Sequence, residues 1–367
     1  MMRRLGILLF LFLFLVPALS LGEGKLVISG GTEKTESLRE RPEERGECTE
    51  ACDIVRHFQT YQEALRVVEK EQMTHLNLGN VPYSVEILGR IKRAMPEGAH
   101  LHFSGVWGGH AFTDKDTELD LGYVSQNIRA QEIADLLFLL PDLKNLDLHT
   151  HTELANEDIA PLVDAYPETE LIWMIHLNRK HLVKSDATAY STLRTPDEDN
   201  PLTAKNLTYL RYARNLKALD LGHNRIEDIS FLKDFPDLRI LILADNRFTD
   251  IIPLEELTEL EYLELFMNDI TTLEPLSGMT KLRDLNISAC DGITSLAPLD
   301  GIPALERLWC ILNRSLPATE IQRFRQKHPS CRLNELGGHA TDAGWREHPR
   351  FAQYREMFLS GEWTPFE

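Results

Sequence analysis

The stretch that decides the fold is residues 216–304, which read LKALDLGHNRIEDISFLKDFPD, LRILILADNRFTDIIPLEELTE, LEYLELFMNDITTLEPLSGMTK and LRDLNISACDGITSLAPLDGIPA when divided before each recurring leucine. The period is 22 residues, with one extra residue in the fourth unit. Aliphatic residues, and then Asn or Cys, return at fixed places: Leu216, Leu238, Leu260 and Leu282; Leu219, Leu241, Leu263 and Leu285; Leu221, Leu243, Leu265 and Ile287; Asn224, Asn246, Asn268 and Cys290. A fixed period of this length predicts stacked coils that share one apolar core.

Each recurring position has a physical role. In a short strand, alternate side chains point to opposite faces, so the leucines at the fourth and sixth places of a unit point inward while their neighbours point out. We expect the Asn to turn the chain out of the strand and to bond backbone groups of the next coil, because a buried polar side chain needs partners. Cys290 takes this place in the fourth unit, with weaker bonding. The returning segments contain Pro253, Pro275 and Pro298, and so predict extended or 3-10 turns rather than a full helix.

The spacing L-x-x-L-x-L-x-x-N/C-x-L resembles the leucine-rich repeat. The elements Asp228-Ile229, Asp250-Ile251, Pro253-Leu254 and Pro275-Leu276 are similar to those of the 22-residue repeats of internalin-like bacterial surface proteins. The resemblance covers roughly residues 205–335. It implies an α/β fold, a leucine-rich-repeat solenoid with a curved parallel β-sheet on its concave face. Helices, and then 3-10 or extended turns, form the convex face. The wall-anchoring elements usual in internalins are absent from residues 336–367, so wall attachment and invasion are not carried over.

Residues 73–200 repeat at a longer spacing. THLNLGNVPYSVEILGRIKRAMPEGAHLHF (74–103) aligns with KNLDLHTHTELANEDIAPLVDAYPETELIW (144–173) at an offset of 70, and both copies read strand, helix, strand. In the second copy, Asn156 is placed to cap a helix whose apolar residues share one face. We therefore predict longer, divergent repeats over 73–200, joined in one continuous solenoid to the regular 22-residue repeats over 201–335.

The first residues follow the pattern of a secretory signal peptide. A basic start, an apolar run over 5–16 and a small-x-small site predict cleavage after Ser20. An uncleaved anchor is the alternative, and only then would we expect a membrane attachment. Residues 21–52 are charged and glycine-rich, which predicts a flexible leader. Residues 53–72 predict an amphipathic helix that caps the first repeat.

Charge and cysteine content narrow the function. The chain has 39 Lys and Arg against 57 Asp and Glu, a formal net charge of −18 that becomes −20 without residues 1–20. We therefore expect no nucleic-acid binding, and we expect a monomer. Five cysteines are too few for a disulfide framework. Cys48 and Cys52 are close enough for a local disulfide, whereas a zinc site lacks a second pair.

The predicted concave face supplies the candidate binding site. Its middle is apolar and aromatic with acidic flanks, a composition typical of an interaction hot spot. The candidate binding residues are Asp220, Ile242, Tyr262, Glu264, Phe266, Asn286, Arg307 and Trp309, of which Tyr262, Phe266 and Trp309 are the anchors. Two alternatives stay open: apolar surface residues without a role, and a face covered by the C-terminal cap.

Residues 336–367 are rich in aromatic side chains. Large apolar residues are concentrated near the end of the chain: Trp345, Phe351, Tyr354, Met357, Phe358, Trp363 and Phe366. We predict a C-terminal cap that folds back on the last coil, and the alternative is an aromatic patch that binds a ligand.

Histidines are the other candidates for chemistry. Asp147, His149 and His151 alternate along one predicted strand, so they share a face and could form a metal site with an open position. The alternative is solvated or turn-stabilising histidines, because a chain with 13 His has such pairs by chance. The sequence contains no H-E-x-x-H, G-x-S-x-G, P-loop or dinucleotide motif.

Together these features predict an exported recognition scaffold, secreted or on the cell surface, that binds a protein or a glycan with its concave face. We expect no enzymatic activity and no cofactor. The alternatives are a metal-dependent enzyme built on Asp147, His149 and His151, and a structural envelope protein whose sheet face is covered by its own terminal segments.

Overall fold

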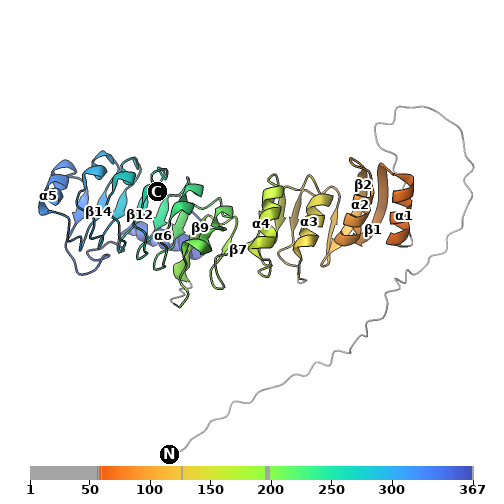
Figure 1. Cartoon of the computed structure of the whole chain (residues 1–367), viewed down its shortest axis with the longest axis horizontal. Helices are drawn as coiled ribbons and strands as arrows, with labels where there is room; N and C mark the ends of the chain where they lie inside the picture. Colours follow the sequence, from red (N-terminus) through yellow and green to blue (C-terminus); the bar gives the residue numbers. More distant parts are fainter. Residues whose placement is uncertain (1–55, 57, 59, 125–126, 195–198, 366–367) are drawn as a thin grey trace, which may run out of the picture. The chain divides into compact units, whose positions relative to one another are not determined.

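The computed structural model describes residues 56, 58, 60–124, 127–194 and 199–365, all of which belong to the compact unit Ala51–Glu367. The predictions for the signal peptide, the leader, Cys48, Cys52 and Phe366 lie outside the described residues. The strands of the described part form four sheets, and short helices or turns connect most of them (Figure 1).

The regular repeats form one seven-stranded parallel sheet in the order β15-β14-β13-β12-β11-β10-β9. Its strands are β9 (Ala189–Ser191), β10 (Ala218–Asp220), β11 (Ile240–Ile242), β12 (Tyr262–Glu264), β13 (Asp284–Asn286), β14 (Arg307–Trp309) and β15 (Arg332–Asn334). The register pairs Leu219 with Leu241, Leu241 with Leu263, and Leu263 with Leu285. These leucines are fully buried in the repeat core. The predicted α/β leucine-rich-repeat solenoid is confirmed.

Short 3-10 turns return the chain between these strands. They are η4 (Ser230–Asp234), η5 (Ile252–Leu254), η6 (Glu274–Leu276) and η7 (Ala297–Gly301), and η1 (Thr192–Arg194), η2 (Ala204–Leu207) and η3 (Leu210–Tyr212) precede them. Pro253, Pro275 and Pro298 stand in the first turn of η5, η6 and η7. Proline is tolerated there because its missing N–H would have no partner in any case. This confirms the prediction of turns on the convex face.

The recurring asparagines form a ladder of hydrogen bonds between coils. Asn246 Nδ2 donates to the Leu221 carbonyl at 3.0 Å, and its Oδ1 accepts from Ile226 N at 3.0 Å. Asn268 Nδ2 donates to the Leu243 carbonyl at 2.9 Å in the same way. In the next coil Cys290 occupies the asparagine position, and its thiol lies 3.3 Å from the Leu265 carbonyl oxygen. The residue before each ladder position has a positive φ, between 53° and 63°: His223, Asp245, Met267, Ala289 and Leu312. The chain therefore turns out of every strand in one recurrent conformation.

The longer repeats form two three-stranded sheets. The first contains β1 (His75–Ser84), β2 (His100–Trp107) and an antiparallel β3 (His110–Thr113), and the second contains β4 (Glu118–Asp120), β5 (Asn145–Asp147) and β6 (Glu170–Ile172). The helices α2 (Val85–Ala94), α3 (Ala130–Leu139) and α4 (Asn156–Ala165) connect these strands. Asn156 does not cap α4 as predicted. Its side chain instead donates to the His176 carbonyl at 2.7 Å and accepts from His176 N at 2.9 Å, so it joins α4 to the next strand.

The parallel ladder is interrupted between β6 and β9. An antiparallel hairpin of β7 (Met174–His176) and β8 (Leu182–Lys184) lies there and pairs with neither parallel sheet (Figure 1). The Asn178 side chain causes the reversal, because its Oδ1 accepts from Lys180 N at 2.9 Å and from His181 N at 2.8 Å. The prediction of one continuous solenoid did not include this break.

Helices lie at both ends of the repeats. The first helix, α1 (Tyr61–Glu71), begins later than the predicted residue 53, because Thr60 Oγ1 caps it by accepting from Glu63 N at 3.2 Å. After β14 come α5 (Ala318–Lys327) and β15, which close the last coil, and then α6 (Pro349–Ser360). No helix in the described part of the chain is long and apolar enough to cross a membrane.

Candidate functional site

The predicted binding residues come together on one face of the seven-stranded sheet. The register aligns Asp220 with Ile242, Ile242 with Glu264, Glu264 with Asn286, and Asn286 with Trp309. Tyr262 and Arg307 lie in the neighbouring row, on either side of Asp284. This surface of β9 to β14 points away from the repeat core, and we call it the covered face.

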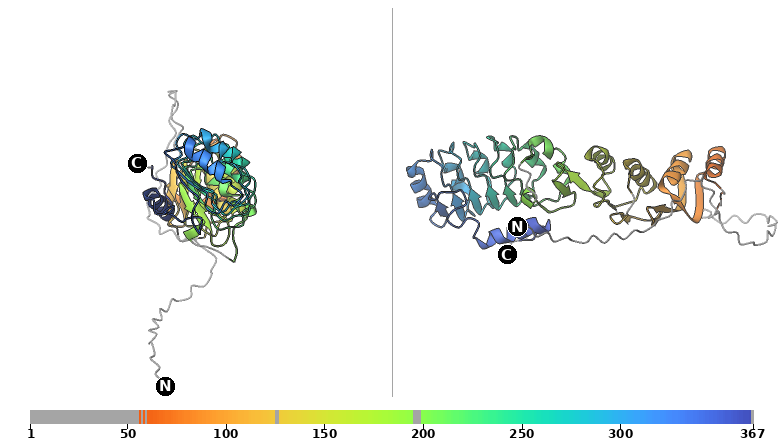
Figure 2. Two further views of the ribbon diagram at one scale, coloured as in Figure 1. Left: turned by 90° about the vertical axis from the view of Figure 1, so that its left-hand side faces the viewer. Right: turned by 90° about the horizontal axis from the view of Figure 1, so that it is seen from below.

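Residues 340–363, here called the C-terminal segment, lie on this face. In the right-hand view of Figure 2 the helix α6 lies beside the row of strands and crosses it, and contacts join it to β9 and β10. Every predicted binding residue is buried as a result, with an exposed fraction between 0% and 4%. The cap was predicted to fold over the last coil. It instead extends from β14 back to β9, while α5 and β15 close the last coil.

Aromatic side chains form the centre of this contact. The Tyr262 ring stacks on Trp345 at 5.4 Å between centroids and meets Tyr354 edge-on at 4.4 Å. Trp309 lies 5.2 Å from Trp345, and its Nε1 donates to the Asp342 carbonyl at 2.8 Å. Burial and the adjacent Glu264 carboxylate raise the pKa of Tyr262 well above its ordinary value. The predicted anchors therefore bind the chain's own C-terminal segment.

Glu264 is fully buried and receives donors from both sides. Trp345 Nε1 donates to its Oε1 at 2.7 Å, and Arg346 Nη2 donates to its Oε2 at 3.2 Å. The Tyr262 hydroxyl donates to Oε1 from the sheet. A buried carboxylate is stable only with such partners, so the C-terminal segment satisfies a charge that the sheet alone leaves with a single hydroxyl.

Asp284 is the second buried acid, and the predicted set of binding residues omitted it. It accepts from Arg307 Nε at 2.7 Å and from Arg350 Nε and Nη2 at 2.9 Å and 2.7 Å. The Tyr354 hydroxyl lies 3.5 Å from its Oδ2, and burial raises the pKa of Tyr354. The sequence signal was the excess of acids in the repeats combined with Arg346 and Arg350 beside the C-terminal aromatics.

Asp220 forms the third acidic position and lies beside a cavity. Its carboxylate accepts from Ser191 Oγ at 2.8 Å and from Gly222 N at 3.0 Å. Burial raises its pKa to about 6. The cavity has a volume of about 390 Å³ between the sheet and α6, and its lining includes Asp220, Ile242, Arg346, Phe351 and Phe358.

The candidate metal residues have partners within the chain. His149 Nδ1 lies 2.7 Å from Asp147 Oδ1, which also accepts from His149 N at 2.9 Å. His151 is buried, with Nδ1 3.2 Å from Glu153 Oε1 and Nε2 2.9 Å from the Leu121 carbonyl. Both ring nitrogens of His151 are therefore engaged. Within residues 60–124, 127–194 and 199–365, no group of three or more His, Cys, Asp or Glu is arranged to hold a metal ion.

Asp147 also has a structural role that recurs along the chain. At the end of a strand, its carboxylate accepts from the backbone N–H two residues on, as Asp120 does for Gly122 at 2.9 Å and Asp220 for Gly222 at 3.0 Å. Asn286 makes the same bond to Ser288 N at 3.0 Å. This Asx turn accounts for an acid at this position without a bound ion.

The second sheet of the longer repeats has exposed side chains on its outward side. We call the outward side of β4, β5 and β6 the open face. Glu118 pairs in register with Asn145, Asn145 pairs with Glu170, and Asp120 pairs with Asp147. Next to them, the Tyr123 ring is 85% exposed and meets the His149 ring edge-on at 6.5 Å. Glu118, Asp120 and Glu170 are also exposed.

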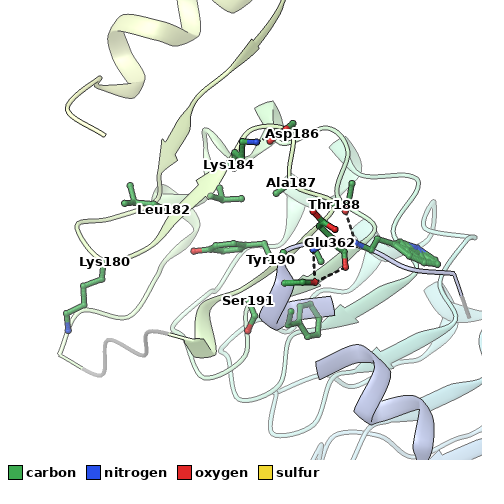
Figure 3. Close-up of a pocket in the computed structure, with 15 residues that line it drawn as sticks. Lys180, Leu182, Lys184, Asp186, Ala187, Thr188, Tyr190, Ser191 and Glu362 are labelled. Atoms are coloured by element: carbon green, nitrogen blue, oxygen red, sulfur yellow. Dashed lines mark hydrogen bonds and ion pairs between the residues drawn. The ribbon is translucent and has the colours of Figure 1, made fainter. Parts of the chain in front are cut away.

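A hollow of about 670 Å³ lies where the ladder is interrupted (Figure 3). Its walls come from β8, from residues 186–191 and from the end of the C-terminal segment, and Tyr190 points into it from β9. Burial raises the pKa of Tyr190. The free edge of β9 is not open, because Ala189 N donates to the Gly361 carbonyl at 3.1 Å and Trp363 N donates to Thr188 Oγ1 at 2.7 Å. The C-terminal segment therefore also occupies this edge.

Comparisons with known proteins agree with the repeat pattern. A family model of leucine-rich repeats (2 copies) matches residues 214–257 and 258–301. The comparison with curated proteins gave no match.

Several solved structures are similar to the chain. An internalin (inlF) from Listeria monocytogenes is 23% identical with a TM-score of 0.35, and the match covers 45% of this chain and 48% of that one. The chain thus spans about half the length of that structure. A leucine-rich-repeat protein from Leptospira interrogans is 19% identical with a TM-score of 0.35, over 71% of each chain. The functional domain of InlJ from Listeria monocytogenes is 16% identical with a TM-score of 0.32, over 56% of this chain and 54% of that one.

The matched residues have the 22-residue period, the parallel ladder and the asparagine positions described above. Residues 214–301 are therefore leucine-rich repeats, and the parallel ladder from β9 to β15 continues the same arrangement on either side of them.

Proposed function

We propose that the chain is an exported scaffold that recognises a protein partner, and that the open face makes the contact. The leucine-rich-repeat fold supports a binding role, because stacked repeats form extended binding surfaces. The pattern of residues 1–20 supports export. Recognition of a glycan stays a prediction, because none of the observed contacts favours a sugar over a protein.

The single observation that carries this proposal is the exposed Tyr123 above His149. An aromatic ring that lies mostly in solvent loses its contact with water when a partner covers it, which is why Tyr is frequent in interaction hot spots. The covered face has aromatic residues as well, but there the C-terminal segment buries them.

Charge indicates the kind of partner. Glu118, Asp120, Asp147 and Glu170 occupy outward positions of β4, β5 and β6, and those positions contain neither lysine nor arginine. A partner with a basic surface complements them, and such complementarity mainly raises the rate of association and its sensitivity to salt. We therefore propose a basic protein surface as the ligand of the open face.

The test immobilises residues 21–367, here called the mature chain, and compares how much of the protein partner each variant captures. Tyr123→Ala is expected to lose the captured protein while the melting temperature stays unchanged, because the ring makes little contact with the core. Leu336→Ala is the matched control, since Leu336 is 74% exposed and lies far along the chain.

A second pair of variants tests the charge. Glu118→Gln combined with Glu170→Gln is expected to weaken capture and to reduce its salt dependence, whereas Glu168→Gln, in the turn before β6, is expected to have no effect. Capture that survives Tyr123→Ala and the double charge variant would refute the open face as the contact.

A further inference from the structure

The C-terminal segment makes a contact that is separate from the repeat core. The leucines of the coils form one apolar cluster, which contains Leu219, Leu241 and Leu263. A second cluster lies between the covered face and the C-terminal segment, and these two clusters share no residue. The repeats therefore have a complete core of their own, and the C-terminal segment attaches to its outside.

The helix α6 presents one face to the sheet. Arg350, Tyr354, Met357 and Phe358 follow the spacing i, i+4, i+7 and i+8, which places them along one side of a helix. Tyr354, Met357 and Phe358 are buried by the contact. This is the arrangement of an amphipathic helix bound in a groove, the mode in which many receptors bind peptides.

The charges of the two sides are complementary. The covered face contributes Glu264 and Asp284, and the C-terminal segment contributes Arg346 and Arg350. Both acids have an exposed fraction of 0%, so they lie at the centre of the contact and not at its rim. Buried pairs of opposite charge determine which partner a surface accepts, because a partner without the matching charges leaves the buried acids unpaired.

The C-terminal segment does not fill its groove. A cavity of about 390 Å³ lies between Ile242 on the sheet and Phe351 and Phe358 on α6. Atoms that line such a space lose dispersion contacts that a larger occupant would supply. The space leaves room at this place for bulkier apolar side chains than the C-terminal segment supplies.

We propose that the covered face is a peptide-binding groove whose ligand is an amphipathic helical segment of a partner protein, with a tryptophan and two arginines that contact the sheet. The C-terminal segment occupies this groove as an internal competitor, and the partner helix displaces it. The covered face is thus a second binding surface, separate from the open face, and its partner is an amphipathic helix. The groove residues are Tyr262, Trp309, Glu264 and Asp284.

The first experiment uses the full mature chain with the segment weakened in place. The probe is a fluorescent synthetic peptide with the sequence of residues 338–365. Because a tethered segment competes at an effective concentration near the millimolar range, we expect the wild-type chain to bind the peptide at least ~100-fold more weakly than the variant Trp345→Ala/Tyr354→Ala. The peptide that carries Arg350→Gln is the matched control and is expected not to bind. Equal, negligible binding by the wild-type chain and by a folded variant would overturn the proposal.

A second measurement keeps the proposal testable if the variant does not fold. A protease site inserted after Gly338 allows the folded full chain to be cut, which leaves the C-terminal fragment held only by its contacts. We expect this fragment to exchange with excess labelled peptide while the repeats stay folded by circular dichroism. Unfolding or aggregation of the repeats when the fragment leaves, or a fragment that never exchanges, would show that the segment is a permanent part of the fold. Either result concerns the covered face alone, because capture through Tyr123 is measured separately.

Discussion

Arg350 donates two hydrogen bonds to Asp284, from Nη2 to Oδ1 at 2.7 Å and from Nε to Oδ2 at 2.9 Å, across 66 residues of sequence. Arg307 reaches the same carboxylate from the neighbouring strand at 2.7 Å. Asp284 has no exposed surface, and these two guanidinium groups compensate its buried negative charge. The Arg350–Asp284 pair therefore joins the C-terminal segment to the covered face through a buried ion pair.

Replacement of Arg350 by alanine leaves Asp284 buried with one cation instead of two. We expect Arg350→Ala to reduce the free energy of unfolding by about 3 kcal/mol, because the loss of one partner leaves a buried charge incompletely compensated. Urea denaturation followed by tryptophan fluorescence measures this change, since Trp309 and Trp345 lie in the contact.

Arg314→Ala is the control for that substitution. Arg314 lies 3.7 Å from Asp291, but its side chain is 80% exposed and that of Asp291 is 55% exposed. Exposed ion pairs contribute little, so we expect a change below about 0.5 kcal/mol. If Arg350→Ala and Arg314→Ala reduced the free energy of unfolding by similar amounts, Arg350 would not be part of a buried ion pair.

The asparagine ladder predicts that substitutions at its positions lower the free energy of unfolding by different amounts. Asn268 Nδ2 donates to the carbonyls of Leu243 and Leu265, both at 2.9 Å. We expect Asn268→Ala to lower the free energy of unfolding by about 2 kcal/mol, because these buried backbone carbonyls lose their hydrogen-bond donor. Cys290→Ala is expected to cost about 1 kcal/mol, since the thiol is a weak donor at 3.3 Å from its acceptor. Urea midpoints of the two variants test this order, and a larger loss for Cys290→Ala would contradict it.

Asp220 predicts a dependence of stability on pH. Burial raises its pKa to about 6 from an ordinary 3.8, so the folded chain binds this proton more tightly than the unfolded chain does. Ionised Asp220 therefore destabilises the fold above about pH 6, and this cost disappears as the pH falls to about 4. We expect Asp220→Asn to be more stable than the wild type by up to about 3 kcal/mol at neutral pH.

The difference between the two proteins is the quantity to measure, because other carboxylates titrate in both. Urea unfolding at several pH values is expected to show the advantage of Asp220→Asn shrinking towards zero between about pH 6 and pH 4. A constant difference over this range would indicate that the substitution acts through packing and not through charge.

The regular repeats could be predicted from the sequence in detail. The leucine positions fix which side chains point inward, and the prolines exclude helices from the returning segments, so the sheet, the turns and the asparagine bonds all follow from local pattern. The break between β6 and β9 could not be predicted in this way. It depends on the Asn178 turn and on the bond between Asn156 and His176, which join positions without a periodic signal.

The candidate site was only partly predictable. The sequence identified the outward row of residues and proposed that it could be covered, but it could not decide between a covered and an open surface. That choice depends on contacts such as Trp345 with Glu264, 81 residues apart, for which no local pattern exists. The exposure of the Tyr123 side chain could likewise not be predicted, because it depends on how the strands of the second sheet lie side by side.

Hydrogen–deuterium exchange of the wild-type chain tests the position of the C-terminal segment most directly. A free helix as short as α6 is marginal in water, so its amides are slow to exchange only when the helix is packed on the sheet. Protection of residues 350–360 that falls in Arg350→Ala is the result we predict. Exchange of these amides in the wild-type chain as fast as in the isolated peptide 338–365 would contradict the account.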